Sequence, residues 1–490
     1  MENKNGKKLL KNTVIYTISG ISIKLFGFFL LPLYTSYLTT SDYGTVNLIT
    51  KLQNVCVYLI CCCLSIVVIR LYSLYKSDPL QSKRLFGTLA SFSFLFGVGV
   101  TAILFLVCYF FTGSLFPGVS FYPTLFMGLF SLTFASLYSL FLENYKAMEK
   151  SLVVAVVSVI YFFVQLALNL VFVVHLKMGA NGVVLSNLIT HFIGTVALFV
   201  LLLSTGKMSI CLDKKILKES LKMSLPLLPN NLALSITAFL SSAFVDRFLS
   251  LASVGLYSLA LQFGYLLESA QTSANTAFQP WFFDAMDNKN GQRDEIQKTT
   301  NAVIWFSGVL SIGCCLFSKE AILIMCHPSY YSSWIYVPAI VGMYVLNIPY
   351  FFIYSVMLFN KTGTKYVFWA TLPTSLLDIL LSYFFIQWIG VFGAVLSDSI
   401  FVVLKTIILF ILSRKFDTSA FSVSSILWKM CIILLVCVAG IAPSYLIWNE
   451  NSFNVYEFLY KILIFSLFFV FFFVFYRKTI CKFFVKKAKK

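Results

Sequence analysis

The chain has 490 residues, of which 59% are hydrophobic and only 11% charged, and its mean hydropathy is +0.87. A soluble protein of this length needs far more charge to cover its surface, so these values exclude the soluble globular class. The formal net charge of +18 does not indicate a nucleic-acid partner, because the basic residues form short groups between apolar runs.

Apolar runs of about 20 residues follow one another along the chain and predict an all-α polytopic membrane protein with about fourteen transmembrane helices. The expected spans are 13–35, 44–70, 85–111, 120–142, 151–175, 182–204, 222–245, 254–281, 300–317, 333–359, 366–388, 392–413, 423–447 and 457–476. If both termini are cytoplasmic, 29 of the 37 lysines and arginines lie in cytoplasmic segments and four in outer segments, so the sequence predicts this orientation.

No feature of the sequence indicates an enzyme, a metal or a cofactor. No loop is long enough to carry a catalytic cluster. Among the twelve cysteines there is no pair of C-x-x-C motifs, and Cys61, Cys62 and Cys63 are expected inside a helix as small apolar residues. His191 is expected to pack between helices, with a proton-transfer role as the alternative.

An internal repeat with an offset of 211 residues organises the chain. TSYLTTSDYG at 35–44 matches DRFLSLASVG at 246–255, and GANGVVLSNLI at 179–189 matches GVFGAVLSDSI at 390–400. Two matches with one offset predict two parallel six-helix bundles that face each other across a central cavity. The predicted lobes are residues 1–206 and 207–415, followed by two extra helices and a basic cytoplasmic tail at 416–490.

Two lysines lie in the middle of the first two predicted spans. Lys24 precedes Tyr34 by ten residues and Lys51 follows Asp42 by nine, so both lie roughly 15 Å below the same membrane face. An ammonium group in hydrocarbon costs about 2.5–3.5 kcal/mol on insertion scales, and such residues usually mark a binding site or pathway. Asn47 and Asn54 lie on the same polar stripe as Lys51 and are expected to line the cavity.

The second half carries acidic residues instead. Glu268, Gln271 and Asn275 form a polar face on the eighth span that is expected to avoid lipid. Asp378 either pairs with Lys405 or belongs, with Asp398 and Glu268, to a site for a coupling cation or proton. Pro226 and Pro229 predict a bent, gating seventh helix.

Two passages resemble Wzx-type bacterial polysaccharide-lipid flippases, a family within the multidrug/oligosaccharidyl-lipid/polysaccharide exporter superfamily. They are NTVIYTISGISIKLFGFFLLPLYTSYLTTSDYGTVNL near the N-terminus and SLPLLPNNLALSITAFLSSAFVDRFLSLASVGLYSLA in the second half, with its Pro-x-x-Pro, Asp-Arg and Val-Gly-x-Tyr-Ser elements. The resemblance implies a V-shaped, two-lobe exporter in the bacterial inner membrane, without a cofactor. Relatives use basic cavity residues to contact a lipid diphosphate or acidic sugars, which suits Lys24, Lys51 and Arg247.

The function implied by this resemblance is the flipping of undecaprenyl-diphosphate-linked oligosaccharide to the outer leaflet, driven by a cation or proton gradient. Polysaccharide polymerase and chain-length proteins are then expected partners. O-antigen, capsule, exopolysaccharide, teichoic-type polymer and peptidoglycan precursor are all compatible glycans. A drug/cation antiporter is one alternative, although related multidrug exporters typically carry an acidic residue in the first span, where this chain has Lys24. A membrane polysaccharide polymerase or glycosyltransferase is the other.

Overall fold

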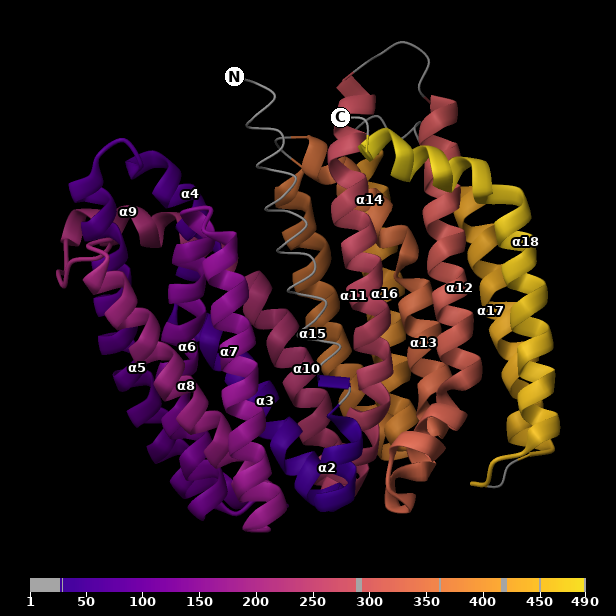
Figure 1. Cartoon of the computed structure of the whole chain (residues 1–490), viewed down its shortest axis with the longest axis horizontal. Helices are drawn as coiled ribbons and strands as arrows, with labels where there is room; N and C mark the ends of the chain where they lie inside the picture. The colour runs from indigo at the N-terminus through magenta and orange to yellow at the C-terminus, as the bar shows by residue number, and fades with distance from the viewer. Residues whose placement is uncertain are drawn as a thin grey trace. The chain divides into compact units, whose positions relative to one another are not determined.

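The fold is known from a computed structural model of the chain, which describes residues 27–28, 30–287, 293–360, 363–415, 421–448 and 451–488. Every regular element in these ranges is helical (Figure 1). The helices form two compact units, Met1–Gly255 and Leu256–Lys490. The predicted lobe boundaries follow the sequence repeat rather than compactness, and they remain a prediction.

The first unit holds the helices up to α10 and the start of α11. Their bounds are α2 Leu31–Tyr37, α3 Thr40–Ile60, α4 Leu64–Tyr75, α5 Pro79–Leu115, η1 Phe121–Leu125, α6 Phe126–Ala147, α7 Ser151–Asn169, η2 Leu170–His175, α8 Gly179–Ser204, α9 Lys214–Ser224, η3 Leu225–Leu227, α10 Leu228–Phe248 and α11 Leu251–Asp287. An apolar core joins α4, α5, α6 and α8 around Val68, Leu89, Leu140 and Leu202, all of which are fully buried.

The second unit holds most of α11 and all the later helices. Their bounds are α12 Arg293–Met325, η4 Pro328–Tyr336, α13 Val337–Leu346, α14 Ile348–Phe359, α15 Thr364–Ile389, α16 Val391–Ser413, α17 Val423–Leu446 and α18 Val455–Ala488. The helices α15 and α16 form an antiparallel hairpin that turns at Gly390, where φ is +63°. The helices α17 and α18 both pack against α12.

Twelve helical stretches in the described ranges are long and apolar enough to cross a membrane. Of the fourteen predicted spans, the first lies mostly outside the described residues. The eighth corresponds to α11, a continuous helix that is not among the twelve. The hydropathy of α11 is lowered by Glu268, Gln271 and Asn275. These three residues form the polar face that the sequence indicated.

The structure corrects the expectation that Cys61, Cys62 and Cys63 lie inside a helix. They form a turn between α3 and α4, with φ of +45° at Cys62 and +57° at Cys63. A left-handed backbone is unfavourable for residues with a side chain, and here the turn is fixed by burial, since Cys61 and Cys63 have no exposed surface. Hydropathy does not detect such a break, because all three residues are apolar.

The predicted bend in the seventh span is confirmed. The single turn of 3₁₀-helix η3, which contains Pro226, separates α9 from α10, and Pro229 lies in the first turn of α10. Proline at these positions removes backbone donors that the first turn of a helix does not need. A gating role for this bend remains a prediction.

Equivalent positions of the repeat have equivalent local structure, which confirms the offset of 211. Thr39 caps α3 by accepting from the backbone N–H of Asp42, and Ser250 caps α11 by accepting from the N–H of Ser253. Gly179 and Gly390 both have positive φ, +57° and +63°. Ser186 and Ser397 are both fully buried. The two halves of the sequence therefore repeat their turns and caps as well as their apolar patterns.

The first turns of α3 and α11 approach each other through a pair of repeat-equivalent glycines. A Cβ atom built on Gly44 would lie 2.1 Å from the carbonyl oxygen of Leu251, and one built on Gly255 would lie 2.0 Å from the carbonyl oxygen of Thr40. Neither position accepts a side chain unless the backbones separate. Glycine is therefore required at both positions for the two helices to touch here.

Candidate functional site

In the first unit, Lys51 joins α3 to α10. Its Nζ donates a hydrogen bond of 2.5 Å to the Oγ of Ser242, a residue with no exposed surface. The Lys51 side chain is itself only half-buried. The bond places the ammonium group of Lys51 at the contact between α3 and α10.

Three other predicted headgroup and cavity residues of the first unit lie along the same two helices. Asn47, one turn from Lys51, is half-buried and donates to the carbonyl oxygen of Tyr43 at 2.8 Å, while Asn54 is exposed. Arg247 is exposed in the last turn of α10. Lys24 lies outside the described residues. The roles of these four residues remain predictions.

A second row of polar side chains crosses the first unit between α7 and α8, and sequence reasoning missed most of it. Gln165 donates to Asn187 at 2.7 Å, and the hydroxyl of Tyr161 lies 2.9 Å from Nδ1 of His191. Tyr138 stacks on Tyr161 with a ring separation of 4.5 Å. His191 therefore packs between helices through a hydrogen bond, in accord with the expected role.

In the second unit, the predicted acidic residues Asp378 and Asp398 lie on the neighbouring helices α15 and α16, which Ser382 and Ser397 join through a hydrogen bond of 2.6 Å. The hydroxyl of Ser382 donates to Asp378 at 3.5 Å, and that of buried Tyr257 donates to Asp398 at 3.3 Å. Glu268 lies on α11, three turns beyond Tyr257. The bond from Tyr257 to Asp398 thus joins α11 to the helix hairpin that carries the two aspartates.

The alternative in which Asp378 pairs with Lys405 is not observed in the described part of the chain. The Nζ atom of Lys405 lies instead over two aromatic rings, 4.0 Å from the ring centre of Tyr350 and 4.8 Å from that of Phe401. Aromatic faces attract a cation strongly in a desolvated site. Asp378 is therefore left to interact with Ser382 and Asp398 rather than with a positive charge.

Gln271 and Asn275 lie between helices rather than on an open face. Both are more than 90% buried. Gln271 donates to the backbone carbonyl of Tyr344 on α13 at 3.3 Å, and Asn275 accepts from Ser355 on α14 at the same distance. These hydrogen bonds hold α11 to α13 and α14. The role of Gln271 and Asn275 in lining a cavity remains a prediction.

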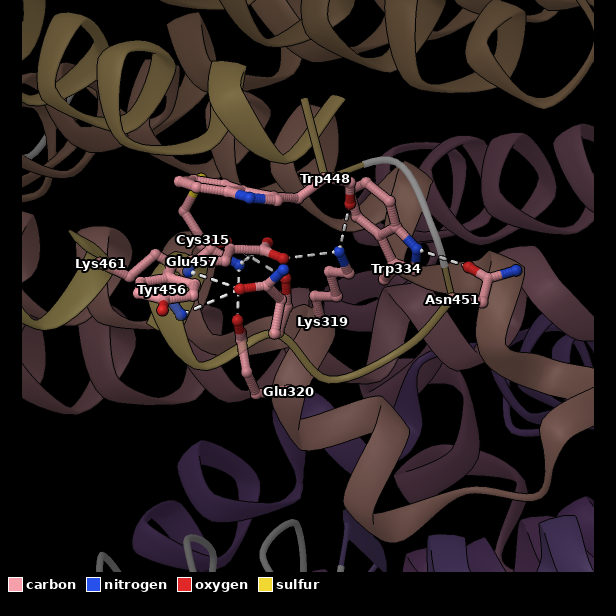
Figure 2. A network of polar contacts seen from close by, with 11 residues as sticks. Cys315, Lys319, Glu320, Trp334, Trp448, Asn451, Tyr456, Glu457 and Lys461 are labelled. Atoms are coloured by element: carbon pink, nitrogen blue, oxygen red, sulfur yellow. Dashed lines mark hydrogen bonds and ion pairs between the residues drawn. The ribbon is translucent and has the colours of Figure 1, made fainter. Parts of the chain in front are cut away.

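A network of four buried charges joins α12 to α18 (Figure 2). Glu457 accepts from Lys319 at 2.8 Å and from Lys461 at 2.6 Å, and Lys461 also pairs with Glu320 at 2.7 Å. All four side chains are at least 93% buried. Lys319 additionally donates to the backbone carbonyl of Trp448 at 2.6 Å. The network contains two lysines and two glutamates, so its positive and negative charges are equal in number.

The sequence offered only part of this network. Lys319 and Lys461 counted among the four basic residues of predicted outer segments, yet both are buried. The spacing of Glu457 and Lys461, one turn apart on an apolar helix, was the available signal. The Nζ atom of Lys319 also lies 5.1 Å from the ring centre of Trp334. This contact requires tertiary packing that the pattern of one helix does not reveal.

Comparison with known proteins assigns the family. Residues 9–286, more than half of the chain, match the family described as "Polysaccharide biosynthesis protein". The chain belongs to this family. The comparison with curated proteins finds no match.

Solved structures share the fold of this polysaccharide biosynthesis protein. The lipid II flippase MurJ in an inward closed conformation is similar with a TM-score of 0.65 and 17% identity, over 94% of this chain and 99% of the other. An inward-facing multidrug resistance MATE family transporter gives 0.61 and 12%, over 82% and 94%. The MATE multidrug transporter DinF-BH in complex with R6G gives 0.59 and 16%, over 85% and 96%.

Proposed function

We propose that this protein flips undecaprenyl-diphosphate-linked oligosaccharide from the cytoplasmic to the outer leaflet of the bacterial inner membrane, for assembly of a cell-surface polysaccharide. The family match concerns polysaccharide biosynthesis, and one solved structure of the same fold is that of a lipid II flippase. The proposed mechanism is alternating access, in which the polar headgroup crosses through protein while the polyprenyl tail stays in lipid.

The observation that carries this proposal is the position of Lys51. It lies nine residues beyond Asp42 in a membrane-spanning helix, and its ammonium group donates to Ser242 at the contact between α3 and α10. A cation at that depth is favourable when an anionic ligand binds beside it. A diphosphate supplies such a charge, and Lys51 would hold it as a point charge together with the predicted headgroup residues Lys24 and Arg247.

The carboxyl pair of Asp378 and Asp398 supports coupling to a proton or a monovalent cation. Two carboxylates on adjacent turns of packed helices repel each other when both are ionised, and a bound proton or cation removes that repulsion. The hydroxyl of Tyr257 donates to Asp398 and that of Ser382 donates to Asp378. Glu268 remains the third candidate. In the described residues, no group of three such side chains is arranged to hold a metal ion.

The test is a flipping assay with purified protein in liposomes that carry a labelled undecaprenyl-diphosphate oligosaccharide in one leaflet. Loss of a hydrogen bond to a charged group costs about 1.5–3 kcal/mol, so Lys51→Ala should lower the rate roughly 10- to 100-fold. Lys51→Arg should retain much of the activity. Lys429→Ala is the matched control, because Lys429 is likewise a lysine of a membrane-spanning helix, α17.

Three outcomes contradict the proposal. Flipping at the normal rate by Lys51→Ala would exclude Lys51 from headgroup binding. Export of a cationic dye in the same liposomes, without flipping, would favour the drug/cation antiporter. Formation of a glycosidic bond by the purified protein would favour the polymerase or glycosyltransferase.

A further inference from the structure

The short helix α9 lies outside the site described above and has two different faces. Figure 1 shows it running across the ends of its neighbours in the first unit rather than parallel to them. It packs against α4 and α5, and its buried face is formed by Ile216, Ser220 and Ser224. On the same side as α4, Glu219 accepts a hydrogen bond of 2.5 Å from the hydroxyl of Tyr75.

The other face of α9 combines positive charge with apolar surface. Lys214, Lys218 and Lys222 are spaced one turn apart, and all three are exposed. None of them forms an ion pair with another residue of the described ranges. Because residues four apart share one side of a helix, the three ammonium groups form a single positive row.

Leucines alternate with these lysines. Leu217, Leu221 and Leu225, together with the three lysines, line a shallow hollow of about 420 Å³. Leu225 is 46% exposed although it is fully apolar. The surface of the hollow is almost entirely apolar, and its charge lies along the lysine row. Such a surface suits an amphiphile whose phosphate meets the lysines and whose hydrocarbon covers the leucines.

The position of α9 identifies the source of that amphiphile. The helix belongs to the connection between α8 and α10, which is predicted to be cytoplasmic, and Lys76, Lys83, Arg84 and Lys207 lie in the loops and helix ends beside it. The cytoplasmic leaflet carries the acidic phospholipids that attract polybasic segments. A transverse helix at this level presents its lysines to headgroups and its leucines to the upper part of the acyl chains.

We infer that the face of α9 formed by Lys214, Lys218 and Lys222 with Leu217 and Leu221, together with Leu225 at the start of η3, binds an acidic phospholipid of the cytoplasmic leaflet. The lysines hold its phosphate and the leucines contact one acyl chain. This site is independent of the proposed transport activity. Its role is to hold the connection between the two repeats at the membrane surface, so the lipid composition of that leaflet sets its stability.

The experiment measures binding of phosphatidylglycerol to the purified full-length protein in neutral detergent, by native mass spectrometry and by the shift in melting temperature. Each lysine near an anionic surface contributes roughly fivefold to affinity, so Lys214→Gln/Lys218→Gln/Lys222→Gln should weaken binding roughly 100-fold. Lys215→Gln is the matched control, because Lys215 is exposed on the same helix but does not line the hollow. It should bind as the unmodified protein does.

Further arms separate the possible occupants. Phosphatidylcholine and inorganic phosphate should give no shift, and Leu225→Gln should weaken the binding of phosphatidylglycerol. Equal losses in the triple variant and in Lys215→Gln would mean diffuse charge only and would overturn the site. An equal shift with inorganic phosphate would assign a soluble anion, and binding of undecaprenyl phosphate without phosphatidylglycerol would assign the carrier lipid. Each of these results contradicts the inference.

Discussion

Replacement of Lys461 by methionine removes one charge from the buried network of α12 and α18 while keeping most of the side-chain volume. In the network, Lys461 is the partner of Glu320 and shares Glu457 with Lys319. After the substitution Glu457 keeps Lys319, but Glu320 loses its cation at a position where its side chain is only 7% exposed. An uncompensated buried charge costs about 3–5 kcal/mol, so Lys461→Met should lower the free energy of unfolding by that amount.

The assay is reversible unfolding in mixed micelles of a neutral detergent and sodium dodecyl sulfate, analysed as a double-mutant cycle. Adding Glu320→Gln to Lys461→Met removes the orphaned charge and should recover about 2 kcal/mol or more. Lys207→Met, at an exposed lysine, should change stability by less than about 0.5 kcal/mol. If Lys461→Met costs less than about 1 kcal/mol, or if the double variant loses the sum of the two single effects, the network does not stabilise the fold as argued.

Three further predictions concern the helix contact and the proposed transport site. Gly44→Ala and Gly255→Ala should each lower the free energy of unfolding by about 1–3 kcal/mol, because the added methyl group overpacks the contact. Gly99→Ala is the control and should not lower it, because a Cβ atom at Gly99 meets open space. Equal melting temperatures for all three variants would contradict the contact. Asp378→Asn should abolish stimulation of flipping by an imposed proton or sodium gradient while leaving substrate binding intact, and stimulation that persists would remove Asp378 from the coupling site. Lys24→Ala combined with Lys51→Ala should abolish surface polysaccharide in cells without altering drug resistance, and normal polysaccharide would refute the headgroup role of the pair.

The membrane helices and the repeat could be predicted from the sequence because both follow from local composition. A run of apolar residues long enough to cross a bilayer has few alternatives to a helix, since backbone polar groups must be satisfied within it. Gly179 and Gly390 occupy equivalent positions in the sequence repeat, and both have a positive φ in the structure. The bend at Pro226 was predictable for a similar reason, because proline acts on its own backbone.

Contacts between helices were harder to predict, because hydropathy does not indicate which helices pack against each other or which polar faces come into contact. Gln271 and Asn275 formed a clear polar stripe, but the structure satisfies them with a backbone carbonyl and a serine of neighbouring helices. Lys405 had an acidic residue at a suitable depth and binds aromatic rings instead. In each case, a residue that contacts the polar or charged side chain lies on another helix. The spacing of residues along one helix does not reveal which neighbouring helix its polar face will meet.

The contact of Gly44 with Gly255 has the form of an isologous interface within a single chain. Gly44 meets residue 251 and Gly255 meets residue 40, and each contact becomes the other when 211 is added to one number and subtracted from the other. Identical subunits related by a two-fold axis produce this exchange. The contact is therefore what would remain if two copies of a half-length ancestor had first paired as a homodimer and were later joined by gene duplication and fusion. In the fused chain, a mutation alters only one of the two equivalent positions. In a homodimer of identical subunits, the same mutation would alter both.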